Sequence, residues 1–255
     1  MLPLKQEIIY GPVNSRRLGR SLGINLLPAR SKVCSFDCVY CQYGRTRVKT
    51  VAPGPEGFPT LGEVITAVET ALTSGPDFDH FTFSGNGEPT LHPQWPEIVE
   101  AVRQLRDRHR PAARLTLLSN SSTAARPAVR ATLARLDVPI MKLDAGDEAT
   151  LAAINCPTSG ISLEAIVEGL AQVPGLVIQS VMVEGAVINC AGPALENWLD
   201  TLSRLRPLRV QVYSTDRPVP EAGVERVPPE RLQQIAARAV HQTGLDVRAY
   251  WPTTH

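Results

Sequence analysis

The sequence lacks long apolar runs and has no segment of the kind that directs a chain into or across a membrane. Its longest apolar stretch, residues 176–183, is far shorter than a bilayer span. Residues 1–10 carry Lys5 and Glu7 and contain no apolar core typical of a signal peptide. We therefore expect a cytoplasmic protein with no membrane partner.

The sequence also lacks the cysteine content of a disulfide framework. It has five cysteines, an odd number, and three of them fall within residues 34–41. Such crowding in a chain expected to reside in a reducing compartment favours a metal or cofactor site. With 43% hydrophobic and 20% charged residues, the composition is that of a folded globular protein.

Net charge is almost absent, at +1, so overall charge argues neither for nor against a nucleic-acid partner. The charge is unevenly distributed, because residues 14–49 contain eight basic residues and a single acid, Asp37. The basic residues are Arg16, Arg17, Arg20, Arg30, Lys32, Arg45, Arg47 and Lys49. Two interpretations remain open: the segment draws an anion toward the cysteines, or it offsets the negative charge of a thiolate-bound metal centre.

Short β-rich apolar runs alternate with segments whose apolar residues recur every three or four positions. We expect strands at 21–27, 80–84, 114–119, 139–144, 176–184, 208–213 and 246–250. We expect helices at 61–73, 95–108, 126–136, 163–172, 193–205 and 229–242.

This alternation predicts an α/β fold of parallel strands joined by right-handed crossovers. About six such units are too few for a closed eight-fold barrel and indicate a partial, open (βα)6-type TIM barrel. A flat doubly wound sheet is the alternative. We expect one domain over 1–255, with an N-terminal extension at 1–20, a core at 21–213 and a C-terminal extension at 214–255. In either architecture the residues that follow each strand meet at one end and form the site.

The residues after the first predicted strand carry a C-x3-C-x2-C pattern formed by Cys34, Cys38 and Cys41. Three thiolates on one short loop can bind three irons of a cubane and leave the fourth iron without a protein ligand. A zinc site is the alternative, although a structural zinc ion usually takes four protein ligands. His80 and His92 could supply a fourth ligand only from distant loops.

The next predicted strand ends in a glycine-rich turn that contains Gly85, Gly87 and Glu88. Glycine lets a backbone approach a ligand closely, and a carboxylate beside it can accept hydrogen bonds from an ammonium group. An ordinary structural turn is the alternative. The turn lacks the Lys-Ser/Thr ending of a phosphate-binding loop.

Taken together, these features resemble the radical S-adenosylmethionine (SAM) superfamily. The cysteine spacing, with Tyr40 just before the last cysteine, is similar to the superfamily signature. The turn at 85–89 resembles its Gly-Gly-Glu motif, and Asn120 and Gln179 follow in the expected order. The resemblance covers roughly residues 11–213 and makes the zinc alternative weak.

The resemblance implies a radical SAM core fold and an oxygen-sensitive [4Fe-4S] cluster that binds SAM. It assigns Cys34, Cys38 and Cys41 to iron; Gly85, Gly87 and Glu88 to the methionine end of SAM; and Tyr40, Asn120 and Gln179 to the adenosyl end. It also implies reduced flavodoxin or ferredoxin as the electron donor. One electron then cleaves SAM to methionine and a 5′-deoxyadenosyl radical, which takes a hydrogen atom from the substrate.

A narrower resemblance, at residues 11–25, 142–145 and 211–218, is to a branch often grouped with wyosine-type tRNA synthases. That grouping says little about substrate, because related folds host many reactions. The sequence also departs from a wyosine synthase. Such enzymes carry extra cysteines before the signature for a second cluster, whereas Cys34 is the first cysteine here.

Further candidates follow the later strands. We assign catalytic roles to Lys142 and Asp144, with a mutual salt bridge as the alternative. Asp216 and Arg217 are candidate substrate-binding residues on the same rim, or a pair that stabilises the loop.

Arg16 and Arg17 precede the first predicted strand, so they reach the substrate only if the N-terminal segment folds over the site. Cys156 and Cys190 are too few for a second cluster, and we expect both to be buried and inert.

The sequence therefore predicts a radical SAM enzyme that acts on an unidentified substrate, either RNA or another anion. Two alternatives stay open: an activase that installs a radical on a protein partner, and a non-catalytic iron–sulfur or zinc module.

Overall fold

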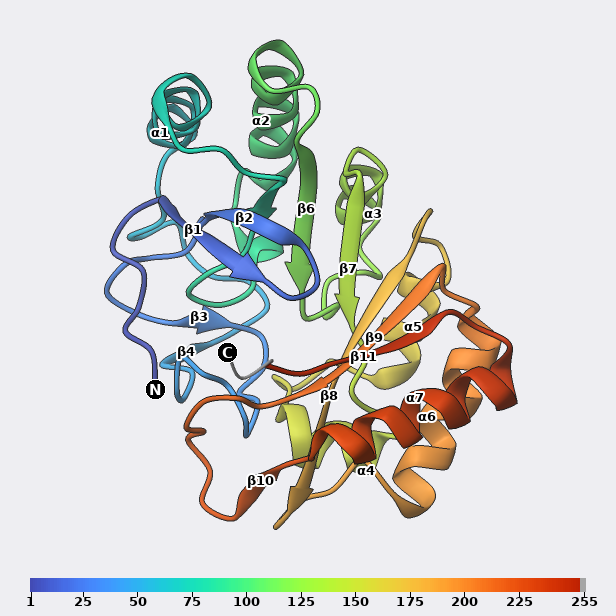
Figure 1. Ribbon diagram of the computed structural model, residues 1–255. Coiled ribbons are helices and arrows are strands. Elements are labelled where there is room, and N and C mark those ends of the chain that lie inside the picture. The colour runs from blue at the N-terminus through green and yellow to red at the C-terminus, as the bar shows by residue number, and fades with distance from the viewer. Residues whose placement is uncertain (253–255) are drawn as a thin grey trace.

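A computed structural model describes residues 1–252 and shows a curved sheet with helices along its outer side (Figure 1). The strand order is β1-β2-β5-β6-β7-β8-β9-β11. The parallel strands are β2 (Gly19–Ile24), β5 (His80–Phe83), β6 (Arg114–Ser119), β7 (Val138–Lys142), β8 (Val177–Gly185), β9 (Arg209–Ser214) and β11 (Val247–Tyr250). The expected partial barrel is confirmed. Its six parallel strands run from β2 to β9, and β11 adds a seventh beside β9.

Helices cross over between these strands. They are α1 (Leu61–Ser74), α2 (Trp95–His109), α3 (Pro127–Leu133), α4 (Glu148–Asn155), α5 (Leu163–Leu170), α6 (Gly192–Leu205) and α7 (Pro229–Thr243). A capping box of Thr60 and Glu63 begins α1, and the buried Val64, Val68 and Leu72 give that helix one apolar face.

Successive side chains of each strand point to opposite faces of the sheet, and this separates the apolar core from the inside of the barrel. In β5, Phe81 and Phe83 are fully buried, and the Phe83 ring lies 5.1 Å from the ring of Trp95 in α2. Thr82 between them points the other way, lines the inner cavity and contacts Ser21 of β2 at 2.7 Å. The apolar core therefore lies between sheet and helices, and the inner face of the sheet is polar.

The sequence analysis missed two elements that matter for the site. Strand β1 (Ile9–Ser15) pairs antiparallel with β2, and its register shifts between Tyr10 and Val13, where Gly11 and Pro12 interrupt the strand pattern. Helix α4 was missed because its apolar residues, at 149 and 151–154, do not recur every three or four positions. Its C-cap, Cys156, has the left-handed conformation.

Smaller elements complete the structure. β3 (Val33–Cys34) and β4 (Val48–Lys49) form a short parallel pair around the cysteine loop, and the 3-10 helix η1 (Pro89–Leu91) follows the glycine-rich turn. β10 (Val224–Arg226) pairs antiparallel with the end of β8. Within residues 1–252, no helix is both long and apolar enough to cross a membrane.

Candidate active site

A cavity of about 530 Å³ lies inside the curve of the sheet. Almost every residue singled out from the sequence lines it. These residues are Arg16, Arg17, Cys34, Cys38, Tyr40, Cys41, Gly85, Gly87, Glu88, Asn120, Lys142, Gln179, Asp216 and Arg217. The exception is Asp144, which lines a small neighbouring void instead. The ends of parallel strands thus bring these side chains to one place.

The cysteine loop is held from three sides. Val33 lies beside Val48 in the β3–β4 pair and forms a bridge with Gly87 of the glycine-rich turn. Phe36 forms a second bridge with Pro157, just beyond α4. All three loop thiols are free, and burial raises the pKa of Cys34 to about 12 and that of Cys38 to about 11. A cation such as iron is therefore needed to keep these sulfurs as thiolates at neutral pH.

The described side chains do not form a site for a single metal ion. Among the described residues, no three Cys, His, Asp or Glu side chains converge closely enough to bind one metal ion. A zinc site requires such convergence. A cubane does not, because each thiolate ligates a different iron.

The glycines of the second motif serve packing within the protein. Gly85 and Gly87 have φ values of 140° and 148°. A Cβ on Gly87 would lie 1.7 Å from the carbonyl oxygen of Val33, and one on Gly85 would lie 2.3 Å from the Asn25 side chain. The turn therefore approaches the cysteine loop so closely that only glycine fits. Asn86 between them, which the sequence analysis did not single out, donates to the carbonyls of Lys5 and Pro28.

The Glu88 carboxylate is buried and ties two strand ends together. Its Oε1 accepts hydrogen bonds from Thr90 and from the Ser119 hydroxyl at 2.9 Å, and its Oε2 accepts one from the Asn120 backbone at 2.6 Å. Burial raises its pKa, although these hydrogen bonds oppose the shift. Because Glu88 lines the cavity and Oε2 has a single donor, this oxygen can accept one more.

The side chain of Asn120 turns toward the cysteine loop. Its Nδ2 lies 2.8 Å from the Ser35 hydroxyl and 3.4 Å from Cys34 Sγ, and its Oδ1 accepts from the Ser122 backbone at 3.0 Å. The residue predicted to contact the adenosyl end of SAM is thus also a neighbour of the sulfur of Cys34, a predicted iron ligand.

Lys142 and Asp144 form a buried pair, the alternative that the sequence left open. Lys142 Nζ lies 3.5 Å from Asp144 Oδ2 and 5.2 Å from the centre of the Tyr40 ring. Burial lowers the pKa of Lys142, but Asp144, Tyr213 and Cys38 together outweigh it and raise that pKa overall. Asp144 Oδ2 also accepts from the Tyr40 hydroxyl, and Oδ1 accepts from the Val181 backbone at 2.8 Å. Of the two, only Lys142 faces the large cavity.

The β1–β2 hairpin places Arg17 inside the barrel. Its Nη1 donates to Gln179 Oε1 at 2.8 Å and to Gln211 Oε1 at 3.2 Å, and its guanidinium lies 4.3 Å from the centre of the Tyr213 ring. Gln211 was not singled out from the sequence. The N-terminal segment therefore folds over the site, as a role for Arg17 requires.

Arg16 and Asp216, which are far apart in the sequence, form an ion pair at the rim of the cavity. Arg16 Nη2 lies 2.8 Å from Asp216 Oδ2, and Arg217 Nε lies 4.0 Å from Asp216 Oδ1. Arg16 thus reaches the loop beyond β9.

Of the two remaining cysteines, Cys190 is buried as expected, but Cys156 is only half-buried, so that part of the prediction was wrong. The left-handed turn at Cys156 and the bridge of Pro157 with Phe36 place Cys156 beside the cysteine loop.

The model of the radical SAM superfamily matches residues 30–219, which is most of the chain. The protein belongs to the radical SAM superfamily. The match includes the cysteine loop and every strand from β5 to β9. The chain is therefore a radical SAM enzyme, and the family implies both SAM and an iron–sulfur cluster as cofactors.

Relatives place it in the UPF0026 group of that superfamily. UPF0026 protein MJ1312 of Methanocaldococcus jannaschii is 34% identical over 90% of this chain and 70% of its own length. UPF0026 protein slr1464 of Synechocystis is 35% identical over 83% of this chain and 77% of its own length. A Brachyspira hyodysenteriae protein named GTPase Obg is 29% identical over 84% of this chain, but the chain spans only 31% of it.

Solved structures share the fold at low sequence identity. TYW1 with a lysine-pyruvate adduct bound superposes with a TM-score of 0.59 at 13% identity, over 88% of this chain and 75% of that one. Streptococcus suis SuiB bound to S-adenosylmethionine gives 0.62 at 12% identity, over 87% of this chain and 49% of that one. These likenesses support the partial barrel.

Proposed function

We propose that this enzyme cleaves SAM reductively at one [4Fe-4S] cluster bound by Cys34, Cys38 and Cys41, and that hydrogen is then taken from a small anionic substrate in the same cavity. The single observation that carries the proposal is that all three thiols and the predicted SAM-binding residues line one cavity. When bound there, the cluster supplies the electron that breaks the C5′–S bond of SAM.

The protein's own groups position the reactants. Glu88 Oε2 can accept a hydrogen bond from the methionine ammonium, with Gly85 and Gly87 in the same turn. Tyr40, Asn120 and Gln179 line the cavity on the side assigned to the adenosyl group. The polar inner face of the sheet thus provides oriented donors and acceptors for the reactants.

Arg17 is the best anchor for an anionic substrate. Its neighbours Gln179 and Gln211 are neutral, and within residues 1–252 it forms no ion pair. Its Nη2 and Nε make no hydrogen bonds to the described residues, so a planar pair of donors remains for a carboxylate or phosphate.

The other arginines near the site are occupied. Arg16, Arg20 and Arg45 pair with Asp216, Asp79 and Glu221, respectively. Three of the eight basic residues of the segment are thus paired with acids, and the free donors of Arg17 lie in the cavity, which favours a small anion over RNA as substrate. We propose reduced flavodoxin or ferredoxin as the electron donor, with the cytoplasm as the compartment that supplies it.

Anaerobic reconstitution tests the reaction. With dithionite and SAM, the reconstituted enzyme is expected to release 5′-deoxyadenosine, and Cys38→Ala should abolish this release. An intact [4Fe-4S] cluster without any SAM cleavage would contradict the proposal and favour a non-catalytic iron–sulfur module.

A thermal-shift titration tests the anchor, with inorganic phosphate as the probe at constant ionic strength. Phosphate should raise the melting temperature of the wild type and of Arg20→Gln, but not of Arg17→Gln. Equal shifts in all three would remove Arg17 as the anchor. Acceleration of SAM cleavage by RNA that is lost in Arg20→Gln would instead identify a nucleic-acid substrate, and acceleration by a protein partner would identify an activase.

A further inference from the structure

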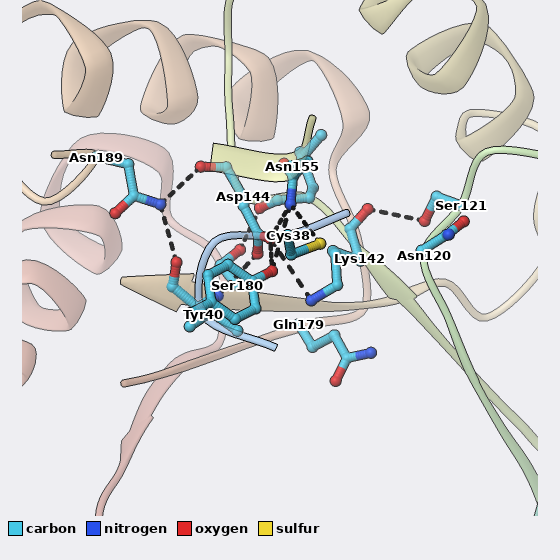
Figure 2. A network of polar contacts seen from close by, with 12 residues as sticks. Cys38, Tyr40, Asn120, Ser121, Lys142, Asp144, Asn155, Gln179, Ser180 and Asn189 are labelled. Carbon is cyan, nitrogen blue, oxygen red and sulfur yellow. Dashed lines mark hydrogen bonds and ion pairs between the residues drawn. The ribbon is translucent and has the colours of Figure 1, made fainter. Parts of the chain in front are cut away.

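Asn155 is the last residue of α4 and lies against the cluster loop, only 1% exposed. Its Nδ2 lies 3.4 Å from Cys38 Sγ and 2.7 Å from Asp144 Oδ2. Figure 2 shows this amide nitrogen between the sulfur and the carboxylate, with Tyr40 and Lys142 beside them. One side chain thus links a proposed iron ligand to a buried charge.

The orientation of the amide follows from its surroundings. A flipped amide would point Oδ1 at the Asp144 carboxylate, and two acceptors repel each other. In the orientation described, Oδ1 is buried without a hydrogen-bond partner among the described residues. Such an orphaned oxygen costs folding free energy. The residue is therefore better explained by what its nitrogen does than by its contribution to stability.

The backbone holds this amide in place. The Asp37 backbone N–H donates to the carbonyl of Asn155 at 3.0 Å, and that of Val39 donates to Ile154 at 3.0 Å. These two contacts lie on either side of Cys38. These contacts keep the end of α4 beside the cysteine loop, and the hydrogen bond to Asp144 holds the amide itself near the sulfur.

We propose that Asn155 is a positioning residue that raises the reduction potential of the cluster. Reduction adds negative charge to the cluster and its sulfurs, and a hydrogen bond to a ligand sulfur stabilises that charge. The second hydrogen bond, to Asp144, places the same amide on the carboxylate whose negative charge lies near Cys38. The inference rests on the proposed function, because it requires the cluster to be bound at Cys38.

The test is a redox titration of the reconstituted, SAM-free cluster in wild type, Asn155→Leu and Asn155→Ala. Electron paramagnetic resonance monitors the reduced cluster and gives the midpoint potential. Leucine fills the space and removes the donor, whereas alanine leaves room for water. The potential should be more negative in both variants than in wild type, and most negative in Asn155→Leu.

Asp147→Ala serves as the matched control. Asp147 caps the other end of α4, where it accepts from the Thr150 backbone at 2.8 Å, and it does not contact the cluster loop. This variant loosens the same helix without removing the sulfur contact, and its potential should match the wild type.

Three results would overturn the inference. The first is an unchanged potential in Asn155→Leu with full iron content, and the second is an equal shift in Asp147→Ala. The third is loss of the cluster from both Asn155 variants but not from Asp147→Ala, which would assign Asn155 to cluster retention. Failure of the wild type to bind a cluster would instead overturn the proposed function, so the two failures are distinguishable by iron analysis.

Discussion

Cys34 and Cys38 lie four residues apart in one loop, yet their surroundings come from different halves of the barrel. Cys34 faces Asn120 and lies near the Glu88 carboxylate, both placed by the ends of β5 and β6. Cys38 faces Asn155 and lies near the Asp144 carboxylate, on the side of β7 and α4. Each sulfur thus has one amide donor at 3.4 Å and one buried acid nearby.

The two sides differ in a single cation. Lys142 lies near Cys38 and lowers its pKa, so that the Cys38 pKa is about 11 although burial and Asp144 raise it. Beside Cys34, Glu88 adds to the effect of burial, and the pKa reaches about 12 because the opposing contributions of the Phe36 backbone and Lys32 are smaller. On the Cys34 side, which carries the recognisable motifs, the negative charge of the buried Glu88 is not balanced by an ion pair with any described residue. On the Cys38 side, the buried Asp144 pairs with the buried Lys142.

The largest expected effect does not distinguish the two sides. Cys34→Ala and Cys38→Ala should each remove an iron ligand and reduce 5′-deoxyadenosine formation to background. Iron content and product release would be measured on the same reconstituted samples. Full activity in either variant would show that the cluster does not depend on that sulfur. The comparison between the Cys34 and Cys38 sides would then no longer hold.

The next effect should be confined to the Cys38 side. Lys142→Met leaves the Asp144 carboxylate buried without its cation and should lower the free energy of unfolding by about 3 kcal/mol. Glu88→Gln should cost less, because Glu88 is held by neutral donors and has no ion pair to lose. Urea unfolding of the cluster-free proteins would measure both. An equal or larger loss in Glu88→Gln would contradict the asymmetry.

The smallest effect is a dependence of stability on pH in the cluster-free protein. An unfolded thiol has a pKa near 9.0, whereas the folded values are about 11 and about 12, so the folded state retains protons that the unfolded state releases. Stability should therefore be nearly constant below about pH 8 with respect to these groups and fall above it, by about 2 kcal/mol between pH 9 and 10.

Urea unfolding at several pH values checks this dependence. The double variant Cys34→Ala, Cys38→Ala should lose most of the decrease above pH 9. The same decrease in the double variant would show that other groups cause it.

Much of the Cys34 side could be predicted from the sequence. The C-x3-C-x2-C spacing, the glycine-rich turn and Asn120 each follow a strand whose apolar pattern is clear. Parallel strands bring such residues together without any knowledge of their side-chain contacts. Even there, the reason for Gly87 was different from the expected one, because the glycine allows contact with Val33 and not only with a ligand.

The Cys38 side depends on features that sequence patterns do not show. Asn155 lies at the end of a helix whose apolar residues show no helical period, and no motif distinguishes it from other asparagines. Arg17 lies in a hairpin whose first strand is interrupted by Gly11 and Pro12. Their positions depend on long-range packing against β8 and the cluster loop. Arg17 was a candidate only if the N-terminal segment folds over the site, and Asn155 was not singled out from the sequence at all.

The central claim is that three thiolates bind a cubane whose fourth iron is open to SAM. Mössbauer spectroscopy of the protein reconstituted with 57Fe, before and after addition of SAM, tests it most directly. The account predicts one [4Fe-4S] cluster per chain in which the signal of a single iron site changes when SAM is added. A cluster whose spectrum is unaffected by saturating SAM would contradict the account.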